Sequence, residues 1–206
     1  MKKIIVCLLA ICALLSFASC GKLSDLNTAV TYPDEYSITY EVTASDGTIS
    51  TIKKSVDENG NIFYKDATHE VIYLRDSSYY VKYEKTADGV FVKNSDEKYT
   101  KKAVEEATSE IKAYTEESKN KFMPTAKQES DTEMFGRSCE VYKLGVGTEN
   151  NSSYTYYYVD KETGICLGTK TKNTALGNEV AHDGASFMCI EFLVDNVDDI
   201  SKLIQQ

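Results

Sequence analysis

Apolar and polar residues alternate along most of the first hundred residues, and this alternation limits the possible fold more than any other feature. In YSITYEV (36–42) every second residue is apolar and the residues between them are polar. A period of two places one set of side chains on each face of a β-strand. Turn signals such as Asp46-Gly47 and Asp88-Gly89 separate such segments. The pattern predicts an antiparallel meander with strands at 36–42, 48–56, 61–65, 71–74, 78–84 and 90–93.

The period then changes to that of a helix. Apolar residues are spaced by three and four positions, at Val104, Ala107, Ile111 and Tyr114. Charged residues stand between them, which predicts an amphipathic helix over 97–121 with a narrow apolar face resting on a sheet. The proline that follows ends this helix, since proline disfavours helix in the residue before it.

Strand patterns return in the second half of the chain, at 138–146, 154–160, 165–173 and 186–194. The last of these is apolar on both faces, which indicates a central strand. Residues 195–203 predict a short closing helix. About ten strands with two helices indicate an α+β fold, and we expect 36–206 to form one domain.

The first 19 residues have the layout of a secretory signal. Lys2 and Lys3 precede an apolar run, 4–15, that is shorter than the about 20 residues of a membrane-spanning helix. The next residues, FASC (17–20), resemble the lipobox of bacterial lipoproteins, in which cleavage leaves a cysteine bearing a diacylglycerol.

This resemblance implies a signal peptide at 1–19, lipidation of Cys20 and a tether over 20–35. The protein would then be extracytoplasmic and attached to the bacterial cell membrane by the diacylglycerol on Cys20. Two such acyl chains hold a protein firmly at a bilayer. An ordinary signal peptide with an incidental cysteine is the alternative.

Charge limits the partners of the chain. It has 23 basic and 32 acidic residues, a net charge of −9, and removal of 1–19 takes two lysines away, which leaves about −11. The sequence has no basic stripe of the kind that phosphate backbones require, so nucleic acid is not expected as a partner. An anionic membrane surface would also repel the chain, which makes the lipid on Cys20 the expected means of attachment.

Three cysteines follow Cys20, namely Cys139, Cys166 and Cys189. No two cysteines have CxxC spacing, so neither a zinc nor a redox motif is predicted. The simplest interpretation is three small apolar side chains inside strands. A disulfide between Cys139 and Cys166 is the alternative, provided that the strands place them together.

Two stretches of the second half, FGRSCEVYKL (135–144) and YTYYYVDKETGICLGTKTK (154–172), resemble the lipoprotein-localisation-factor-like superfamily. The resemblance implies a curved antiparallel sheet, an open half-barrel of about ten strands, with one long helix and a short C-terminal helix packed on it. Members include carriers of lipidated proteins, lipid-binding lipoproteins and sensors of envelope stress. The matching residues serve the fold, so the resemblance selects none of these activities.

The sequence contains no motif typical of an enzyme. His69 and His182 are its only histidines, too few for a multi-histidine metal site. Nucleophile-elbow, zinc-protease and phosphate-loop motifs are absent from it. Acidic pairs at 105–106, 116–117 and 198–199 are expected on helix surfaces, where adjacent side chains point about 100° apart. We therefore expect no catalytic residues, no metal and no cofactor.

The 15 tyrosines are the remaining signal. Tyrosines of the strands and the apolar face of the helix could form a groove for a hydrophobic ligand, a lipid or an acyl chain. The candidate groove residues are Tyr79, Tyr83, Val104, Ile111, Tyr114, Tyr154, Tyr156 and Tyr158. The structural alternative is that these tyrosines pack a sheet under a helix. The protein would then be an envelope sensor or protein-interaction module whose sheet is filled by its own side chains.

Overall fold

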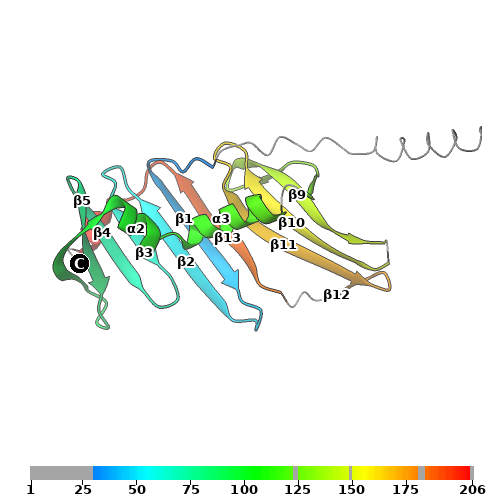
Figure 1. Cartoon of the computed structure of the whole chain (residues 1–206), viewed down its shortest axis with the longest axis horizontal. Helices are drawn as coiled ribbons and strands as arrows, with labels where there is room; N and C mark the ends of the chain where they lie inside the picture. The colour runs from blue at the N-terminus through cyan, green and yellow to red at the C-terminus, as the bar shows by residue number, and fades with distance from the viewer. Residues whose placement is uncertain (1–29, 123–124, 149, 181–183, 205–206) are drawn as a thin grey trace, which may run out of the picture.

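The computed structural model describes residues 30–122, 125–148, 150–180 and 184–204 (Figure 1). Within them the strands are β1 (Tyr36–Thr43), β2 (Ile49–Val56), β3 (Ile62–Lys65), β4 (Glu70–Asp76), β5 (Tyr79–Lys85), β6 (Phe91–Thr100), β7 (Lys127–Gln128), β8 (Thr132–Met134), β9 (Arg137–Gly147), β10 (Ser152–Asp160), β11 (Cys166–Ala175), β12 (Asn178–Val180) and β13 (Ser186–Val194). The helices are α2 (Lys101–Ala107), α3 (Glu110–Glu117), the π-helical η1 (Ser118–Phe122) and the 3-10 helix η3 (Ile200–Ile204).

The described strands form one open antiparallel sheet of 13 strands. Its order is β6-β5-β4-β3-β2-β1-β13-β11-β10-β9-β7, with β12 paired to β11 and β8 to β9. The path ends at β6 on one side and at β7 on the other, so the sheet does not close. The strand β13 lies between β1 and β11 and joins the two halves of the chain, which confirms the central position expected for 186–194.

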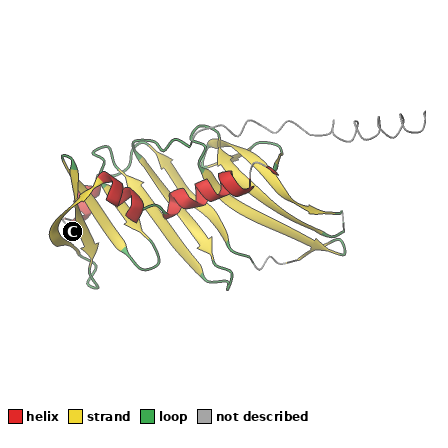
Figure 2. Cartoon of the chain, viewed as in Figure 1, coloured by secondary structure: helices red, strands yellow, loops and turns green. Residues whose placement is uncertain are grey.

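The α-helices cross one face of this sheet, from the β4–β5 region toward β10, and we call this the helix face (Figures 1 and 2). Side chains of β1 alternate between the two faces, and Tyr36, Ile38 and Tyr40 point to the helix face. Tyr40 is fully buried and donates a hydrogen bond to the Cys166 carbonyl at 2.7 Å. The main core therefore lies between the sheet and the helices.

The prediction of one helix over 97–121 is wrong in two respects. Its first four residues belong to β6, and the rest is divided at Thr108 and Ser109. Both hydroxyls donate to carbonyls one turn earlier, Thr108 to Val104 at 2.9 Å and Ser109 to Glu106 at 2.8 Å. Such bonds compete with backbone helix bonds. Two short helices of 7 and 8 residues result.

The C-terminal helix is shorter than the predicted 195–203 and lies on the opposite face, which we call the back face. Ile200 of η3 packs in a second cluster with Ile72 and Phe91. Ile72 is flanked in β4 by Val71 and Tyr73, which belong to the main core. Because neighbouring residues of a strand point to opposite faces, η3 covers the face that the α-helices leave uncovered.

The chain joins the sheet before β1. The Thr31 backbone N–H donates to the Thr163 carbonyl at 2.8 Å, and Val30 and Tyr32 pack against the main core. The last residues of the expected tether, 30–35, thus lie against the domain.

Cys20 and the expected signal peptide lie outside the described residues. In the described part of the chain, no helix is long and apolar enough to cross a membrane.

A buried ion pair fixes the start of β9 to the end of β10. Both Arg137 nitrogens Nε and Nη2 donate to the Asp160 carboxylate, at 2.8 and 2.9 Å, and Nη2 also contacts Glu162 at 2.8 Å. The Asp160 side chain is 1% exposed and also accepts from the Thr163 backbone and hydroxyl. Burial acts to raise the pKa of Asp160, but Arg137 and Thr163 outweigh it, so the pKa is lowered.

Asp57 accepts most of the side-chain hydrogen bonds that shape the β2–β3 turn, and it is 0% exposed. Its carboxylate accepts from the Asn59 and Asn61 backbone N–H groups at 3.0 and 2.9 Å, and from the Asn61 amide at 2.9 Å. It also accepts from the Ile200 backbone N–H at 3.0 Å. One carboxylate therefore shapes the turn and attaches η3 to the sheet.

Cys139, Cys166 and Cys189 are free and buried, so the structure does not contain the alternative Cys139–Cys166 disulfide. Burial raises the pKa of both Cys139 and Cys166 to about 11 and that of Cys189 to about 12. Because the thiolate is the reactive form, these cysteines serve as small core residues in the folded protein.

Candidate functional site

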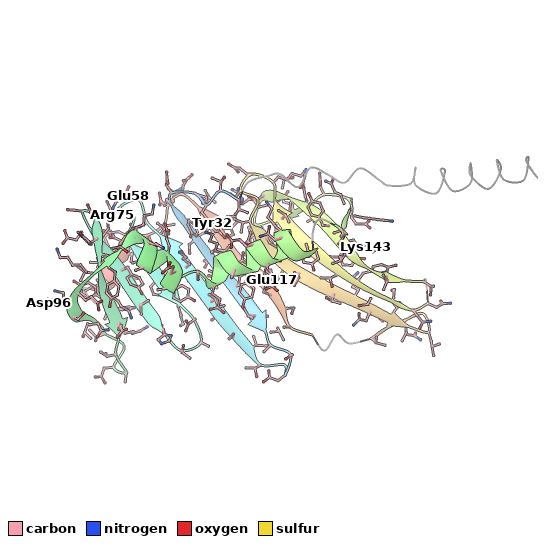
Figure 3. The ribbon with its side chains drawn as sticks, viewed as in Figure 1. Tyr32, Glu58, Arg75, Asp96, Glu117 and Lys143 are labelled. Carbon is pink, nitrogen blue, oxygen red and sulfur yellow. The ribbon has the colours of Figure 1, made fainter. Side chains whose placement is uncertain are left out.

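A groove of about 1450 Å³ runs along the helix face. It lies between the α-helices and the ends of the strands that the β2–β3 and β4–β5 turns connect. Its walls come from residues 30–36, from β2 to β5, and from 101–120. Figure 3 shows Glu58 and Arg75 at one end of this region and Tyr32 nearer the other. The groove volume is larger than that of most small-molecule pockets, which is about 300–1,000 Å³.

Apolar side chains form the floor of the groove and charged side chains form its rim. The floor residues are Val30, Tyr36, Val56, Ile62, Tyr80 and Ile111. The rim residues are Asp34, Glu58, Arg75, Lys101, Lys102, Glu105, Glu106, Lys112, Glu116 and Lys119. An apolar floor beside a charged rim suits an amphiphile, because its apolar chain can contact the floor and its polar head the rim.

Lys54 is the exception, because it is a charged residue of the floor. It stands in β2 between Ile52 and Val56 on the helix face, and its Nζ lies 3.4 Å from the Thr108 carbonyl at the break between α2 and α3. Burial lowers the pKa of Lys54 to about 8, Lys112 adds to this, and Glu105 opposes it. A half-buried lysine with a lowered pKa in a groove is a candidate functional group.

Tyr32 contributes a hydroxyl to the groove wall. Its oxygen is buried and makes no hydrogen bond of normal geometry within the described structure. Burial raises the pKa of Tyr32 to about 12, although Thr115 acts to lower it. The hydroxyl is therefore a neutral donor on the groove wall.

The three candidate residues of the helix are all on its sheet side. Val104 is fully buried, and Ile111 is buried and also lines the groove. The Tyr114 ring stacks on Phe187 with centroids 4.7 Å apart, and its hydroxyl donates to Glu110 at 3.3 Å. Val104 and Tyr114 therefore fill the core beside the groove without lining it.

The structure places the five strand tyrosines on the back face, away from the groove. Tyr79 is 46% exposed, and Tyr83 packs with the η3 cluster. Tyr154, Tyr156 and Tyr158 share one face of β10, as their spacing requires. They alternate with Tyr157 and Val159, which belong to the core of the helix face. These five residues do not converge with the helix residues, since neighbouring positions, such as Tyr80 and Tyr157, face the helices.

Lysines accompany the tyrosines of β10 on the back face. Lys143 Nζ lies 4.1 Å from the ring centroid of Tyr154 and 5.7 Å from that of Tyr156. Lys172 Nζ lies 5.9 Å from the Tyr156 ring. Such cation–π contacts contribute about 0.5–1 kcal/mol each at exposed sites.

The other candidate chemical groups do not assemble into a site. His69 lies in the β3–β4 turn, where its Nδ1 is 2.7 Å from the Thr68 hydroxyl, and His182 lies outside the described residues. Glu105 and Glu106 are exposed on α2 and pair with Lys101 and Lys102. Among the described residues, no group of three potential metal-ligating side chains is found.

Sequence reasoning missed Lys54, although the sequence holds its signal. In STIKKSV (50–56), Ile52, Lys54 and Val56 share one face of the strand, so a lysine interrupts an apolar row. The groove itself could not be predicted, because segments far apart in the chain form its walls.

Comparisons with known proteins place the chain in no family: no family model matches it, and no curated protein matches it.

Proposed function

We propose that this protein is a membrane-anchored extracytoplasmic lipoprotein that binds an amphiphilic lipid in the groove of its helix face. The observation that carries the proposal is the groove itself, which joins an apolar floor to a charged rim. The resemblance of the second half of the chain to the lipoprotein-localisation-factor-like superfamily is compatible with this function, since its members include lipid-binding lipoproteins, but they also include sensors of envelope stress.

The position of the groove relative to the proposed anchor also supports this function. Val30 and Tyr32 belong to its wall, and only nine residues separate Cys20 from Val30. The ten Cα-to-Cα steps between them span at most about 35 Å when fully extended. A lipidated Cys20 would therefore keep the groove within about one bilayer thickness of the membrane surface, where an amphiphile could enter it.

The anchor is tested by replacing Cys20 with serine in the full-length chain. Serine cannot form the thioether to the diacylglycerol, and the acidic chain has no other expected hold on the membrane. We expect the protein to move from the membrane fraction to the soluble or secreted fraction of the cells. Unchanged membrane association of the Cys20→Ser variant would refute the lipid anchor.

The ligand is tested with photoactivatable probes of two kinds, a fatty acid and the corresponding fatty alcohol. Full-length protein in phosphatidylcholine nanodiscs is irradiated with each probe. Ser109 lines the groove and is exposed, so a Ser109→Trp variant should obstruct it and lose most of its labelling.

Ser95→Trp is the matched control, because Ser95 is an exposed serine of β6 outside the groove. Its labelling should equal that of the unmodified protein. The proposal fails if neither probe labels the protein, or if both tryptophan variants behave alike.

An envelope sensor or protein-interaction module is the second candidate. One observation favours this second function. The protein's own side chains fill the centre of the helix face, including Tyr40 and Ile38, which are both 0% exposed. Such a module would present its surface to a partner protein and need no ligand. Absence of labelling together with a specific crosslink to one envelope protein would favour this second function.

A further inference from the structure

The charge of Lys54 has no carboxylate partner within 4.0 Å among the described residues. The three rim lysines of the α-helices do have partners: Lys101 with Glu105, Lys102 with Glu106 and Lys112 with Glu116, at 3.8, 3.8 and 3.5 Å. Within the part of the chain that the structure describes, Lys54 makes one hydrogen bond, to the Thr108 carbonyl at 3.4 Å, which is at the long limit of such bonds. The Lys54 ammonium is partly removed from water without a paired carboxylate, so an anion placed beside it would be favoured.

We infer that Lys54 binds the acidic head group of the amphiphile, and that this head group carries a single negative charge, as the carboxylate of a fatty acid does. The inference rests on the proposed function. Lys54 lies on the groove floor beside Val56, with Ile62 and Tyr80 further along the same floor. A carboxylate at the Lys54 ammonium thus leaves its acyl chain on the apolar part of the groove.

The surrounding charges favour a monoanion over a dianion. Five carboxylates among the described residues line the groove, and five basic residues of the same rim balance their charge: Asp34, Glu58, Glu105, Glu106 and Glu116 against Arg75, Lys101, Lys102, Lys112 and Lys119. One carboxylate and one lysine of the helices act on Lys54: Glu105 of α2 favours its charge and Lys112 of α3 opposes it. One ammonium matches one carboxylate, whereas the second charge of a phosphate monoester would meet rim lysines whose charges Glu105, Glu106 and Glu116 already offset.

A structural role is the competing explanation for Lys54. Its contact with the Thr108 carbonyl places a positive charge at the end of α2, where the helix dipole is negative. That role would appear in the stability of the protein and would not distinguish one ligand from another. The test therefore measures selectivity between ligands that differ only in the head group.

The experiment measures displacement of the photoactivatable fatty alcohol from full-length protein in phosphatidylcholine nanodiscs. The competitors are oleate, oleyl alcohol and oleyl phosphate. A charge-assisted hydrogen bond in a partly buried site should make oleate about tenfold or more stronger than oleyl alcohol. Oleyl phosphate should be weaker than oleate. Above about pH 8, where Lys54 loses its proton, the advantage of oleate should decrease.

Lys54→Met should abolish the preference for oleate, and Lys54→Arg should retain it. Lys53→Met is the matched control: the neighbouring Lys53 points to the back face and pairs with Glu191 at 3.0 Å, so its loss should leave the preference unchanged. Equal displacement by oleate and oleyl alcohol would overturn the inference while leaving the proposed function intact. If Lys53→Met abolished the preference for oleate as Lys54→Met does, that result would also overturn the inference. Absence of any labelling would refute the proposed function itself.

Discussion

An Arg137→Ala variant is expected to lose about 3–5 kcal/mol of unfolding free energy, because it leaves a buried carboxylate without its partner. Asp160 is 1% exposed and receives two hydrogen bonds from Arg137, at 2.8 and 2.9 Å. Arg137 also lies over the Phe192 ring, 5.2 Å from its centroid, so the variant loses packing too. Urea denaturation followed by circular dichroism measures the loss.

Lys161→Ala is the control for this variant, since Lys161 forms an ion pair with Asp131 that is largely exposed. Its cost should stay within about 1 kcal/mol.

The pH dependence gives a second check. The pKa of Asp160 is lowered in the folded protein, so its contribution to stability is present above the unfolded value of about 3.9 and is lost as the pH falls below it. A difference between wild type and Arg137→Ala that persists unchanged below about pH 4 would contradict the assignment.

Asp57→Ala should lower the unfolding free energy by about 2–4 kcal/mol, because it removes the acceptor of four buried or partly buried donors. Three donors belong to Asn59 and Asn61, and the fourth is the backbone N–H of Ile200. Hydrogen exchange should also become faster in η3, which depends on this carboxylate for its attachment to the sheet. Denaturation and hydrogen-exchange mass spectrometry measure the two effects.

Asp66→Ala is the comparison for Asp57→Ala. Asp66 makes the same kind of turn between β3 and β4, accepting from the Thr68 and His69 backbone N–H groups, but its side chain is 22% exposed and its partners are exposed. Water can replace those bonds, so this variant should cost about 1 kcal/mol or less. Equal costs for Asp57→Ala and Asp66→Ala would show that burial of Asp57 does not matter.

The strands were predictable because local rules decide them. Alternation in 36–42 and 186–194 reports burial on one or both faces, and the turns between strands carry their own residue signals. The short strands β7, β8 and β12 contain two or three residues each and show no measurable period. They exist because β9 and β11 offer unpaired edges, which is a property of the assembled sheet.

The site was predictable only in part. Strand parity groups Tyr154, Tyr156 and Tyr158 together but does not state which face the helices will cover. The helices cover the face of Tyr157, so the larger group of tyrosines lies on the other side. The division of the helix at Thr108 depended on a hydroxyl that is 0% exposed, and the same break gives Lys54 its carbonyl contact.

Mapping the photolabel tests the central claim most directly, namely that the groove of the helix face holds an amphiphile. Full-length protein in nanodiscs is labelled with the photoactivatable fatty acid, digested and analysed by mass spectrometry. The predicted result is label on peptides from 52–62 and 101–120, which form the floor and the wall of the groove. Label confined to the back-face residues Tyr154, Tyr156 and Tyr158, or spread evenly over the surface, would contradict it.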